Sequence, residues 1–206
     1  MEYMADNKAH TDRRIVRSRA AIKAAFERLL IKMPLSDITV SAIAREANID
    51  RKTFYVHFGT IDGLLDAIAE DSVTAIIDSV ERSLGGRAAT FDSERAHEAI
   101  EVFFSTINKA ICENLLLNRR IMENLPLDDF MTRVRKPLER ELISRKFFPE
   151  GMVDKDFEYY VSFLLSGIIG IYRSWVLSDE SEPLEKISQI ANDLTVHGLS
   201  CLDAMR

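Results

Sequence analysis

The sequence predicts an all-α protein of about nine helices. Apolar residues recur at the three- and four-residue spacing of a helix along most of the chain, whereas the alternation typical of a half-buried strand is almost absent. Helix-breaking residues are also scarce, because the 206 residues include only 8 glycines and 5 prolines. This length, with 47% hydrophobic residues, is sufficient to bury a core in one or two domains.

The charge is distributed unevenly along the chain. The formal net charge is −6, yet residues 1–60 contain 11 basic and 7 acidic side chains, while residues 61–206 contain 16 and 26. A mildly basic N-terminal part on an acidic body favours a polyanionic partner at one end only.

Three features of the sequence bear on the cellular compartment. Cys112 and Cys201 form no CxxC motif, so we interpret them as inert thiols, with a redox sensor as the alternative. The N-terminus lacks the apolar segment of a signal peptide. The longest uncharged apolar run, 159–172, has 14 residues, fewer than the ~20 that span a bilayer. We therefore expect a cytoplasmic protein that does not enter a membrane.

The first domain is expected over 12–60, with its first helix over 13–32. Apolar residues there form one stripe, and Pro34 follows, a residue that stops helices. Thr39 is expected to cap a short helix beginning at Val40, because its hydroxyl can accept a hydrogen bond from a free amide of the first turn.

A tight turn and a second short helix follow. Asn48 tolerates the left-handed backbone that such a turn needs, and Asp50 is a suitable N-cap for a helix over 51–58. Gly59 breaks that helix, and Thr60 caps the next one. Two short helices joined by a turn of a few residues form a helix-turn-helix pattern.

The second domain is expected over 61–206, and it begins with a linking helix over 61–84. A loop marked by two adjacent glycines follows at 84–92. The helix expected over 155–178 is apolar nearly all round, so it must be buried on most sides. Four other helices are expected: one that starts after Asp92, one over 114–124, one that starts near Phe130, and one from Ser181 to His197. Pro137 is expected to kink the third of these or to restart it, and a turn is expected at 149–151.

The second short helix contains residue types that read DNA. A recognition helix presents its N-terminal turn to base edges in the major groove. Arg51 and Lys52 can reach guanine acceptors or phosphates, and Thr53 and Tyr55 offer hydroxyl contacts. His57 can donate to a phosphate. An ordinary solvated helix start is the alternative interpretation of the two cations.

The two aromatic rings of this helix have a different role. Phe54 and Phe58 are four residues apart and share one face, which we expect to pack on the preceding helices. The first helix is also basic, and Arg13, Arg14 or Arg17 could touch phosphate, with a solvated face as the alternative.

At these residues the chain resembles the DNA-binding domain of the tetracycline-repressor (TetR) family. The resemblance covers about residues 12–65. Its features are Thr39 before the first short helix, IA at 43–44, Ala47 in the turn, TFY at 53–55, and HF at 57–58 followed by Gly59.

The resemblance implies a homodimeric transcriptional regulator, usually a repressor, whose all-helical C-terminal part dimerises and binds an inducer. The implied partners are a palindromic double-stranded DNA operator, a second copy of the chain and a small-molecule effector. The resemblance also implies that Thr39 contacts phosphate, that Arg51, Lys52 and Thr53 face bases, and that Tyr55 and His57 hold the DNA backbone.

Two positions depart from the family pattern. Asn48 stands where many members have glycine, and both residues can adopt the backbone of the turn. Ile61 stands where many members have lysine, so a phosphate contact from that position is lost or supplied elsewhere.

The region 93–178 is rich in Phe, Met and Tyr, which makes an apolar ligand cavity between helices reasonable. Three polar residues there, Asn108, Arg119 and Tyr160, could orient a ligand. Plain core packing is the alternative for each candidate. The ligand-pocket candidates are Phe103, Phe104, Ile107, Asn108, Arg119, Met122, Phe130, Met131, Tyr159, Tyr160 and Phe163.

The last two helices expose more apolar surface than one chain can cover, and Gly167 and Gly170 allow a second helix to approach closely. We expect both helices to pair with their symmetry mates in a four-helix interface. The dimer-interface candidates are Leu164, Gly167, Ile168, Ile171, Trp175, Leu184, Ile187, Ala191 and Leu194.

Motifs of catalysis are absent from the sequence: there is no P-loop, nucleophile elbow, HExxH or glycine-rich dinucleotide turn, so neither an enzyme nor a cofactor is expected. The histidines and cysteines lack metal-ligand spacing. The alternative function is a helix-turn-helix protein of the same fold whose C-terminal part binds a protein partner, as a co-activator would, instead of a small inducer.

Overall fold

The computed structural model describes residues 2–83, 93–147, 157–178 and 182–203. Those ranges contain nine α-helices, one short 3-10 helix and no strand, which confirms the predicted all-α class. The chain divides into two compact units, Met1–Ile68 and Ala69–Arg206.

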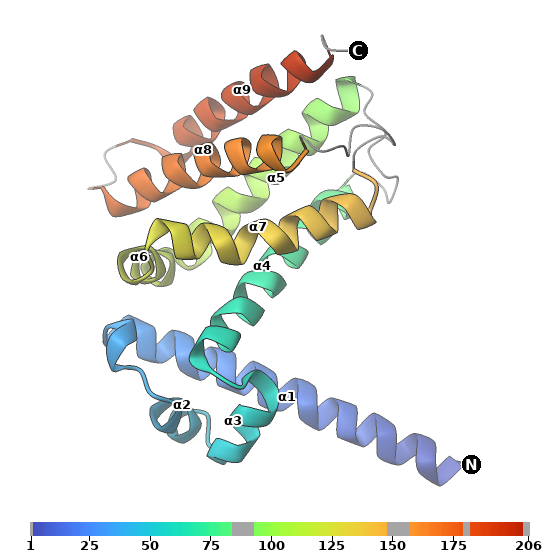
Figure 1. The fold of residues 1–206 in the computed structure, drawn as a ribbon, viewed down its shortest axis with the longest axis vertical. Coiled ribbons are helices and arrows are strands. Elements are labelled where there is room, and N and C mark those ends of the chain that lie inside the picture. The colour runs from blue at the N-terminus through green and yellow to red at the C-terminus, as the bar shows by residue number, and fades with distance from the viewer. Residues whose placement is uncertain (1, 84–92, 148–156, 179–181, 204–206) are drawn as a thin grey trace. The chain divides into compact units, whose positions relative to one another are not determined.

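The first unit consists of three helices and the start of a fourth (Figure 1). The first helix begins well before the predicted range of 13–32, because no glycine or proline interrupts the residues that precede it. The predicted starts of the two short helices are correct. In chain order the elements are α1 (Glu2–Lys32), the 3-10 turn η1 (Leu35–Asp37), α2 (Val40–Glu46), α3 (Arg51–Phe58) and α4 (Ile61–Ser83).

The core of the first unit gathers apolar side chains from these four α-helices. α1 contacts α2 and α3, and α2 contacts α3. Phe54 of α3 and Leu64 in the first turn of α4 are fully buried, and the neighbouring Leu65 is 7% exposed. The division between the two compact units falls inside α4, after Ile68. The other buried side chains are Ile22, Ala25, Phe26, Leu29, Leu30, Ile38, Ile43 and Ala44.

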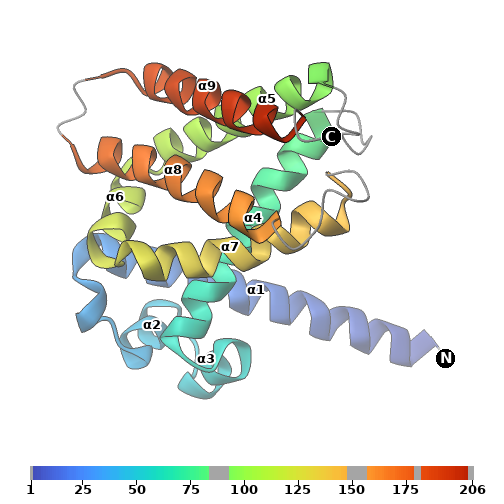
Figure 2. The ribbon, with the colours of Figure 1, turned by 45° about the horizontal axis from the view of Figure 1, so that its top comes forward.

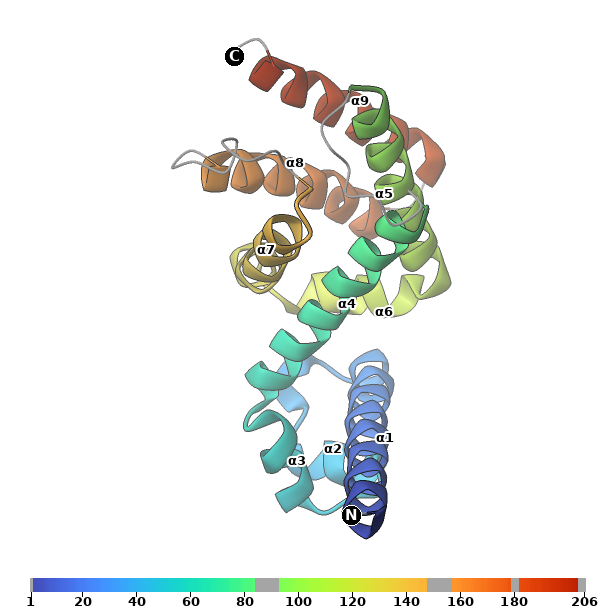
Figure 3. The ribbon, with the colours of Figure 1, turned by 90° about the vertical axis from the view of Figure 1, so that its right-hand side faces the viewer.

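Two backbone segments approach closely at the junction of α3 and α4, which follow each other directly (Figure 3). Gly59 has φ +70° and ψ −53°, and the amide of Thr60 donates to the carbonyl of Phe58 over 2.7 Å, closing a three-residue turn. A β-carbon on Gly63 would collide with the same carbonyl oxygen. Thr60 caps α4 as predicted, because its hydroxyl accepts from the Gly63 amide at 2.9 Å. The direction in which α3 leaves α4 thus depends on two glycines.

The second unit is a helical bundle that starts with the rest of α4. Figure 2 shows α8 between α7 and α9, and α8 contacts both of these helices and α6. The elements are α5 (Ser93–Glu113), α6 (Leu115–Asn124), α7 (Leu127–Ser144), α8 (Phe157–Leu177) and α9 (Leu184–Asp203).

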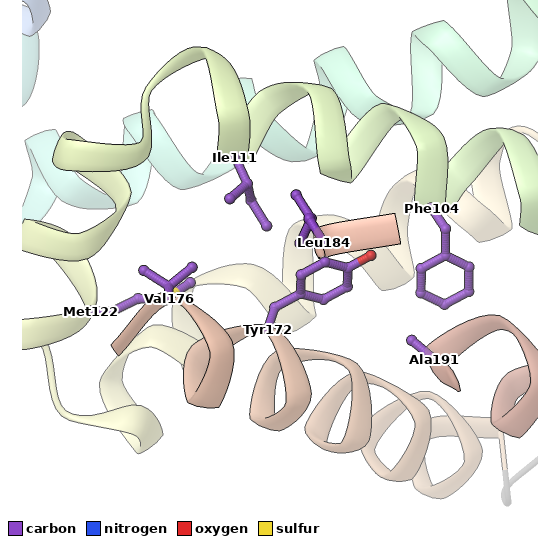
Figure 4. Packing of buried hydrophobic residues seen from close by; sticks show 7 residues of the cluster. All are labelled: Phe104, Ile111, Met122, Tyr172, Val176, Leu184 and Ala191. Atoms are coloured by element: carbon purple, nitrogen blue, oxygen red, sulfur yellow. The ribbon is translucent and has the colours of Figure 1, made fainter. Parts of the chain in front are cut away.

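Two apolar clusters hold this bundle together. In the larger one, side chains from α5, α6, α8 and α9 meet, and the ring of Tyr172 stacks on Phe104 with centroids 6.4 Å apart (Figure 4). The smaller one joins α4 to α7 and α5. The buried members of the first are Phe104, Ile111, Met122, Tyr172, Val176, Leu184 and Ala191, and those of the second are Val73, Ile77, Val80 and Phe147.

The helices of the second unit differ in places from the predicted ones. Pro137 does not restart a helix, because it lies inside α7, which runs from Leu127 to Ser144. The predicted loop at 84–92, the turn at 149–151 and Ser181 lie outside the described residues. The last helix begins at Leu184 and runs past its predicted end at His197 to Asp203. Among the described helices, α8 is long and apolar enough to cross a membrane, judged by its length and composition only. Its buried side chains pack on the neighbouring helices of the bundle, as in the core helix of a helical domain.

Ion pairs add a polar link between α4 and α7. The guanidinium of Arg145 lies 2.6 Å from carboxylate oxygens of both Asp78 and Glu81 on α4, and 2.8 Å from Glu141 on its own helix. The hydrogen bonds to these carboxylates, first that to Asp78, raise the pKa of Arg145. One turn earlier, Arg140 pairs with Glu70 at 2.6 Å. Both ends of the contact between these helices are thus paired by charge.

The substitution Gly63→Ala tests whether the α3–α4 junction is sterically fixed. In an open helix the change would stabilise the protein by about 1 kcal/mol, because alanine favours helix. Here the new β-carbon meets the Phe58 carbonyl, so we expect a loss of roughly 1–3 kcal/mol in the free energy of unfolding. Urea unfolding followed by circular dichroism measures it. A variant as stable as the wild type would contradict the steric explanation.

Candidate nucleic-acid interface

The turn between α2 and α3 is built from local backbone signals. The hydroxyl of Thr39 accepts a hydrogen bond from the Ala42 amide at 3.1 Å, which confirms the predicted cap of α2. Asn48 has φ +53°, the predicted left-handed conformation. Asp50 occupies the N-cap position of α3, but its side chain makes no capping bond, because its backbone carbonyl accepts from the Thr53 amide instead. Asp50 therefore caps α3 by position only.

Helix α3 has one buried and one exposed face. Phe54 is fully buried, and the Phe58 ring lies 5.9 Å from it, so the predicted inner face is confirmed. Arg51 and Lys52 are exposed, and one turn later so is Tyr55. Thr53 and His57 are half-buried at the edges of this face. The exposed face therefore offers cations and an aromatic hydroxyl together, as a major-groove surface requires.

One member of the exposed face was missed by sequence reasoning. Val56 is 73% exposed, more than Tyr55 at 55%. The available signal was the four-residue spacing from Lys52, which places both side chains on the same side of a helix.

Arg51 has a partner within the unit. Its Nη1 donates to the hydroxyl of Ser41 on α2 at 3.3 Å. The arginine predicted to read a base therefore lies against the preceding helix in the protein without DNA. Ser41 was not among the predicted site residues, because a contact between two helices leaves no local signal in the sequence.

The cations of α1 fall into two groups. Arg19 donates to the backbone carbonyl of His57 at 3.3 Å, and its guanidinium lies 4.7 Å from the centre of the Phe58 ring. Lys23 donates to the carbonyl of Ala67 at 3.3 Å. Arg28 pairs with Glu46 at 2.6 Å. These three therefore hold α1 to α3, α4 and α2. Arg13, Arg14 and Arg17, nearer the N-terminus, are exposed and open to phosphate, and Lys32 at the other end of the helix is exposed as well.

The environment of His57 disfavours its charged form. Partial burial, and second the nearby guanidinium of Arg19, lower the pKa of His57. The imidazole is therefore mainly neutral at neutral pH in the protein without DNA, and a phosphate at this edge would oppose both effects.

The predicted ligand-pocket residues of the second unit separate by burial. Phe104 and Met122 are buried in the larger cluster, with Phe103 and Ile107 packed against it. Phe130, Met131 and Tyr160 are half-buried. Tyr159 and Phe163, by contrast, are 70% and 75% exposed on α8, so within one chain they do not line an enclosed pocket.

The polar members of that prediction also have partners. Asn108 accepts a hydrogen bond from the Tyr172 hydroxyl at 2.8 Å, inside the larger cluster. Burial raises the pKa of Tyr172 to about 12, so this hydroxyl keeps its proton, although a hydrogen bond to Ser188 opposes the shift. Arg119 pairs with Glu123 at 3.4 Å on the surface of α6. Tyr172 was not predicted, because the periodicity of α8 does not mark one inner side.

The predicted dimer residues separate in the same way. Leu184 and Ala191 are buried in the chain's own core, while Ile168, Ile171, Trp175 and Ile187 are half-buried against it, and Leu164 is half-buried. Leu194 is 62% exposed on α9. A β-carbon on Gly167 or Gly170 would meet no atom within 4 Å, so α8 offers open, small-residue surface there. Leu184 and Ala191 are therefore corrected to core residues, since α9 turns that side toward α5 and α8.

Together, the helix-turn-helix unit with its exposed cationic face and the helical bundle define a DNA-binding transcriptional regulator. Residues 22–68 match the family described as bacterial regulatory proteins of the tetR family, and residues 95–197 match a transcriptional regulator C-terminal region. The chain therefore belongs to the TetR family, a family of DNA-binding regulators and not of enzymes.

Individual relatives agree with this assignment. The uncharacterized HTH-type transcriptional regulator YxbF of Bacillus subtilis is 32% identical over 174 residues, which cover 79% of this chain and 40% of YxbF. The HTH-type transcriptional regulator EthR of Mycobacterium tuberculosis is 37% identical over 87 residues, 42% of this chain and 40% of EthR. The chain thus spans about two fifths of the length of the curated relatives it matches.

Solved structures share the fold at low sequence identity. The fatty acid degradation regulator FadR from Bacillus halodurans superposes with a TM-score of 0.60 at 14% identity, covering 88% of this chain and 96% of that one. FadR from Thermus thermophilus, a TetR-family repressor solved with lauroyl-CoA, gives 0.59 at 15% identity, with coverages of 87% and 94%.

The first prediction for this interface concerns Arg51. If Arg51 contacts a guanine through two hydrogen bonds, Arg51→Ala should weaken operator binding by ~1–3 kcal/mol. The operator is obtained by sequencing the genomic fragments that the purified protein retains, and affinity is measured by fluorescence anisotropy. Arg82→Ala, which removes an exposed cation of α4 in the second unit, is the matched control. Wild-type affinity in the double variant Arg51→Ala/Tyr55→Phe would contradict the assignment.

The second prediction couples DNA binding to pH through His57. The imidazole pKa is lowered in the free protein, and a phosphate contact favours the imidazolium, so the complex holds more protons than the free protein. Affinity should therefore rise as pH falls from about 8 to about 6, where histidine titrates. His57→Gln should lose most of this dependence in anisotropy titrations at constant ionic strength. Equal pH dependence in both proteins would refute the phosphate contact.

Proposed function

We propose that this regulator is a cytoplasmic homodimeric repressor that binds a palindromic operator and leaves it when an apolar or amphipathic small molecule binds. The observation that carries the DNA-binding role is that α3 exposes Arg51, Lys52 and Tyr55 while it buries Phe54 fully. Thr39, Thr53 and His57 flank that face as further phosphate or base contacts.

The apolar surface of α8 and α9 supports dimerisation. Tyr159 and Phe163 are exposed on α8, and Ile190 and Leu194 are exposed on α9. Large apolar side chains in such numbers on adjacent helices favour a covered surface. Gly167 lies on α8 with open space around it, so the backbone of a second α8 could approach. We therefore add Tyr159, Phe163 and Ile190 to the interface, and retain Leu164, Gly167, Ile168, Ile171, Trp175, Ile187 and Leu194.

The larger cluster of the second unit supports a ligand site. It is apolar, it lies where four helices meet, and it contains the hydrogen-bonded pair Tyr172 and Asn108. A ligand entering among these helices would meet aromatic rings and one polar pair that could orient a hydroxyl or carbonyl group. We retain Phe103, Phe104, Ile107, Asn108 and Met122 as lining candidates and place Arg119, Phe130, Met131 and Tyr160 at the periphery.

α4 provides the covalent connection between the proposed DNA-binding surface and the proposed ligand site. Its first turn fixes the direction of α3 through Gly63, and its later turns pair with Arg140 and Arg145 of α7. A ligand that changes how α7 packs would therefore act on the helix that carries the recognition helix. A coupling of about 1–3 kcal/mol between ligand and DNA would be sufficient for regulation.

Dimerisation is tested by a charge placed on the exposed apolar surface. Phe163→Arg with Leu194→Arg should convert the protein to a monomer at micromolar concentration, because the pairing would bury unpaired cations. Operator affinity should fall steeply, since two recognition helices ~34–36 Å apart are needed for a palindrome. Leu116→Arg, an exposed leucine of α6, is the matched control and should remain dimeric. Sedimentation of the wild type as a monomer with full operator affinity would refute the dimer.

The ligand is tested by thermal shift with a panel of apolar and amphipathic metabolites and drugs. A true effector should weaken operator binding, and by reciprocity operator DNA should weaken its binding by the same factor, about 5- to 150-fold. Calorimetric titration with and without operator measures both. A ligand that binds equally in both titrations is not an inducer. Release of the operator by a protein and by no small molecule would instead favour the co-activator alternative.

A further inference from the structure

Val56 is an exposed apolar residue that packing within the chain does not explain. It is 73% exposed, whereas the other apolar residue of the same turn, Phe54, is fully buried. A β-branched residue also loses rotamer freedom in a helix, so valine is a poor choice for a solvated helical position. Val16 on α1 is exposed as well, so exposure alone does not mark a contact. Val56 differs because it lies on the eight-residue α3 beside the exposed cations Arg51 and Lys52, and this position points to a contact made outside the chain.

Val56 lies on the same exposed surface of α3 as the two cations. Arg51 and Tyr55 are four residues apart along α3, and so are Lys52 and Val56, which places each pair on one side of the helix. The two pairs are adjacent and exposed, so the four side chains share one exposed surface. Phe54, with the Phe58 ring against it, forms the inner side of the helix. Any duplex that the two cations reach is therefore also within reach of the isopropyl group of Val56.

The chemistry of the major groove then limits the target. An isopropyl group neither donates nor accepts a hydrogen bond, so it gains nothing from base nitrogens, carbonyls or phosphates. The one apolar group on the major-groove edges of the four base pairs is the C5-methyl group of thymine. We propose that Val56 is a specificity-determining residue that selects a thymine in the operator by packing on this methyl group. This inference rests on the proposed DNA-binding function.

The size of the effect follows from the area of one methyl group. Burial of one such group changes affinity about fourfold. Replacing the thymine by deoxyuridine removes that group and leaves all hydrogen-bonding atoms of the base pair in place. The comparison therefore isolates the apolar contact from the hydrogen bonds of Arg51.

The experiment is a deoxyuridine scan of the operator that the protein retains from genomic fragments. Each thymine of one half-site is replaced in turn, and affinity is measured by fluorescence anisotropy at fixed salt. We expect one position at which deoxyuridine weakens wild-type binding about fourfold. Val56→Ala should bind the thymine operator about as weakly, and should bind the thymine and deoxyuridine operators equally.

A control variant and a second modified base make the test specific. Val16→Ala on α1, a valine 65% exposed in the same unit, should keep the wild-type preference for thymine. At the same position, a 5-methylcytosine·guanine pair should bind wild type more tightly than a cytosine·guanine pair, and Val56→Ala should not distinguish them. Circular dichroism spectra of both variants should match the wild type, since both side chains are exposed.

The outcomes separate this inference from the function on which it rests. Wild-type protein that binds every deoxyuridine operator like the parent refutes the role of Val56 and leaves the DNA-binding function standing. An equal loss from deoxyuridine in wild type and in Val56→Ala also refutes it, because another residue or the shape of the DNA then senses the methyl group. Failure to retain any DNA fragment would refute the proposed function itself.

Discussion

The close approach of the Phe58 carbonyl to Gly63 determines how the recognition helix is presented. Because no side chain fits between the end of α3 and the first turn of α4, the two helices are joined as one rigid corner. α4 belongs to both units, and its buried leucines anchor it in the first one. Within the first unit, the direction of α3 is therefore set by backbone contact with the first turn of α4.

The first unit uses its positive charge for two purposes. Arg19, Lys23 and Arg28 connect α1 to the other helices through carbonyl and carboxylate oxygens, and so they stabilise the scaffold. Arg51 and Lys52 are exposed on α3, so their charges are open to a polyanion. A count of basic residues in this part of the sequence overstates the charge that is free to meet DNA. The geometry of the unit decides which cations bind the protein itself.

Local signals in the sequence were sufficient for most of the fold. Thr39, Asn48 and Thr60 act within three or four residues of themselves, and their roles were predicted correctly. The inner side of α8 was not predictable, because a helix that is apolar nearly all round has no unique buried stripe, and Phe163 was assigned to a pocket for this reason. In α9 the apolar stripe with Leu184 and Ala191 was recognised, but a stripe does not tell whether it packs on its own chain or on a second copy, so both residues were assigned to an interface. The contacts of Arg19 and of Arg51 with Ser41 join separate helices, so no spacing in the sequence announces them.

The ion pairs between α4 and α7 have a consequence for how salt dependence is interpreted. Arg140 and Glu70 are both about half exposed, and Asp78 and Glu81 are partly exposed, so added electrolyte weakens their attraction. The same electrolyte weakens phosphate contacts by competing for the DNA. If the bundle acts on DNA binding through α4, as proposed, the slope of affinity against ionic strength includes a contribution from these ion pairs and is not a plain count of phosphates touched. The unfolding stability of the DNA-free protein over the same range of ionic strength supplies the correction.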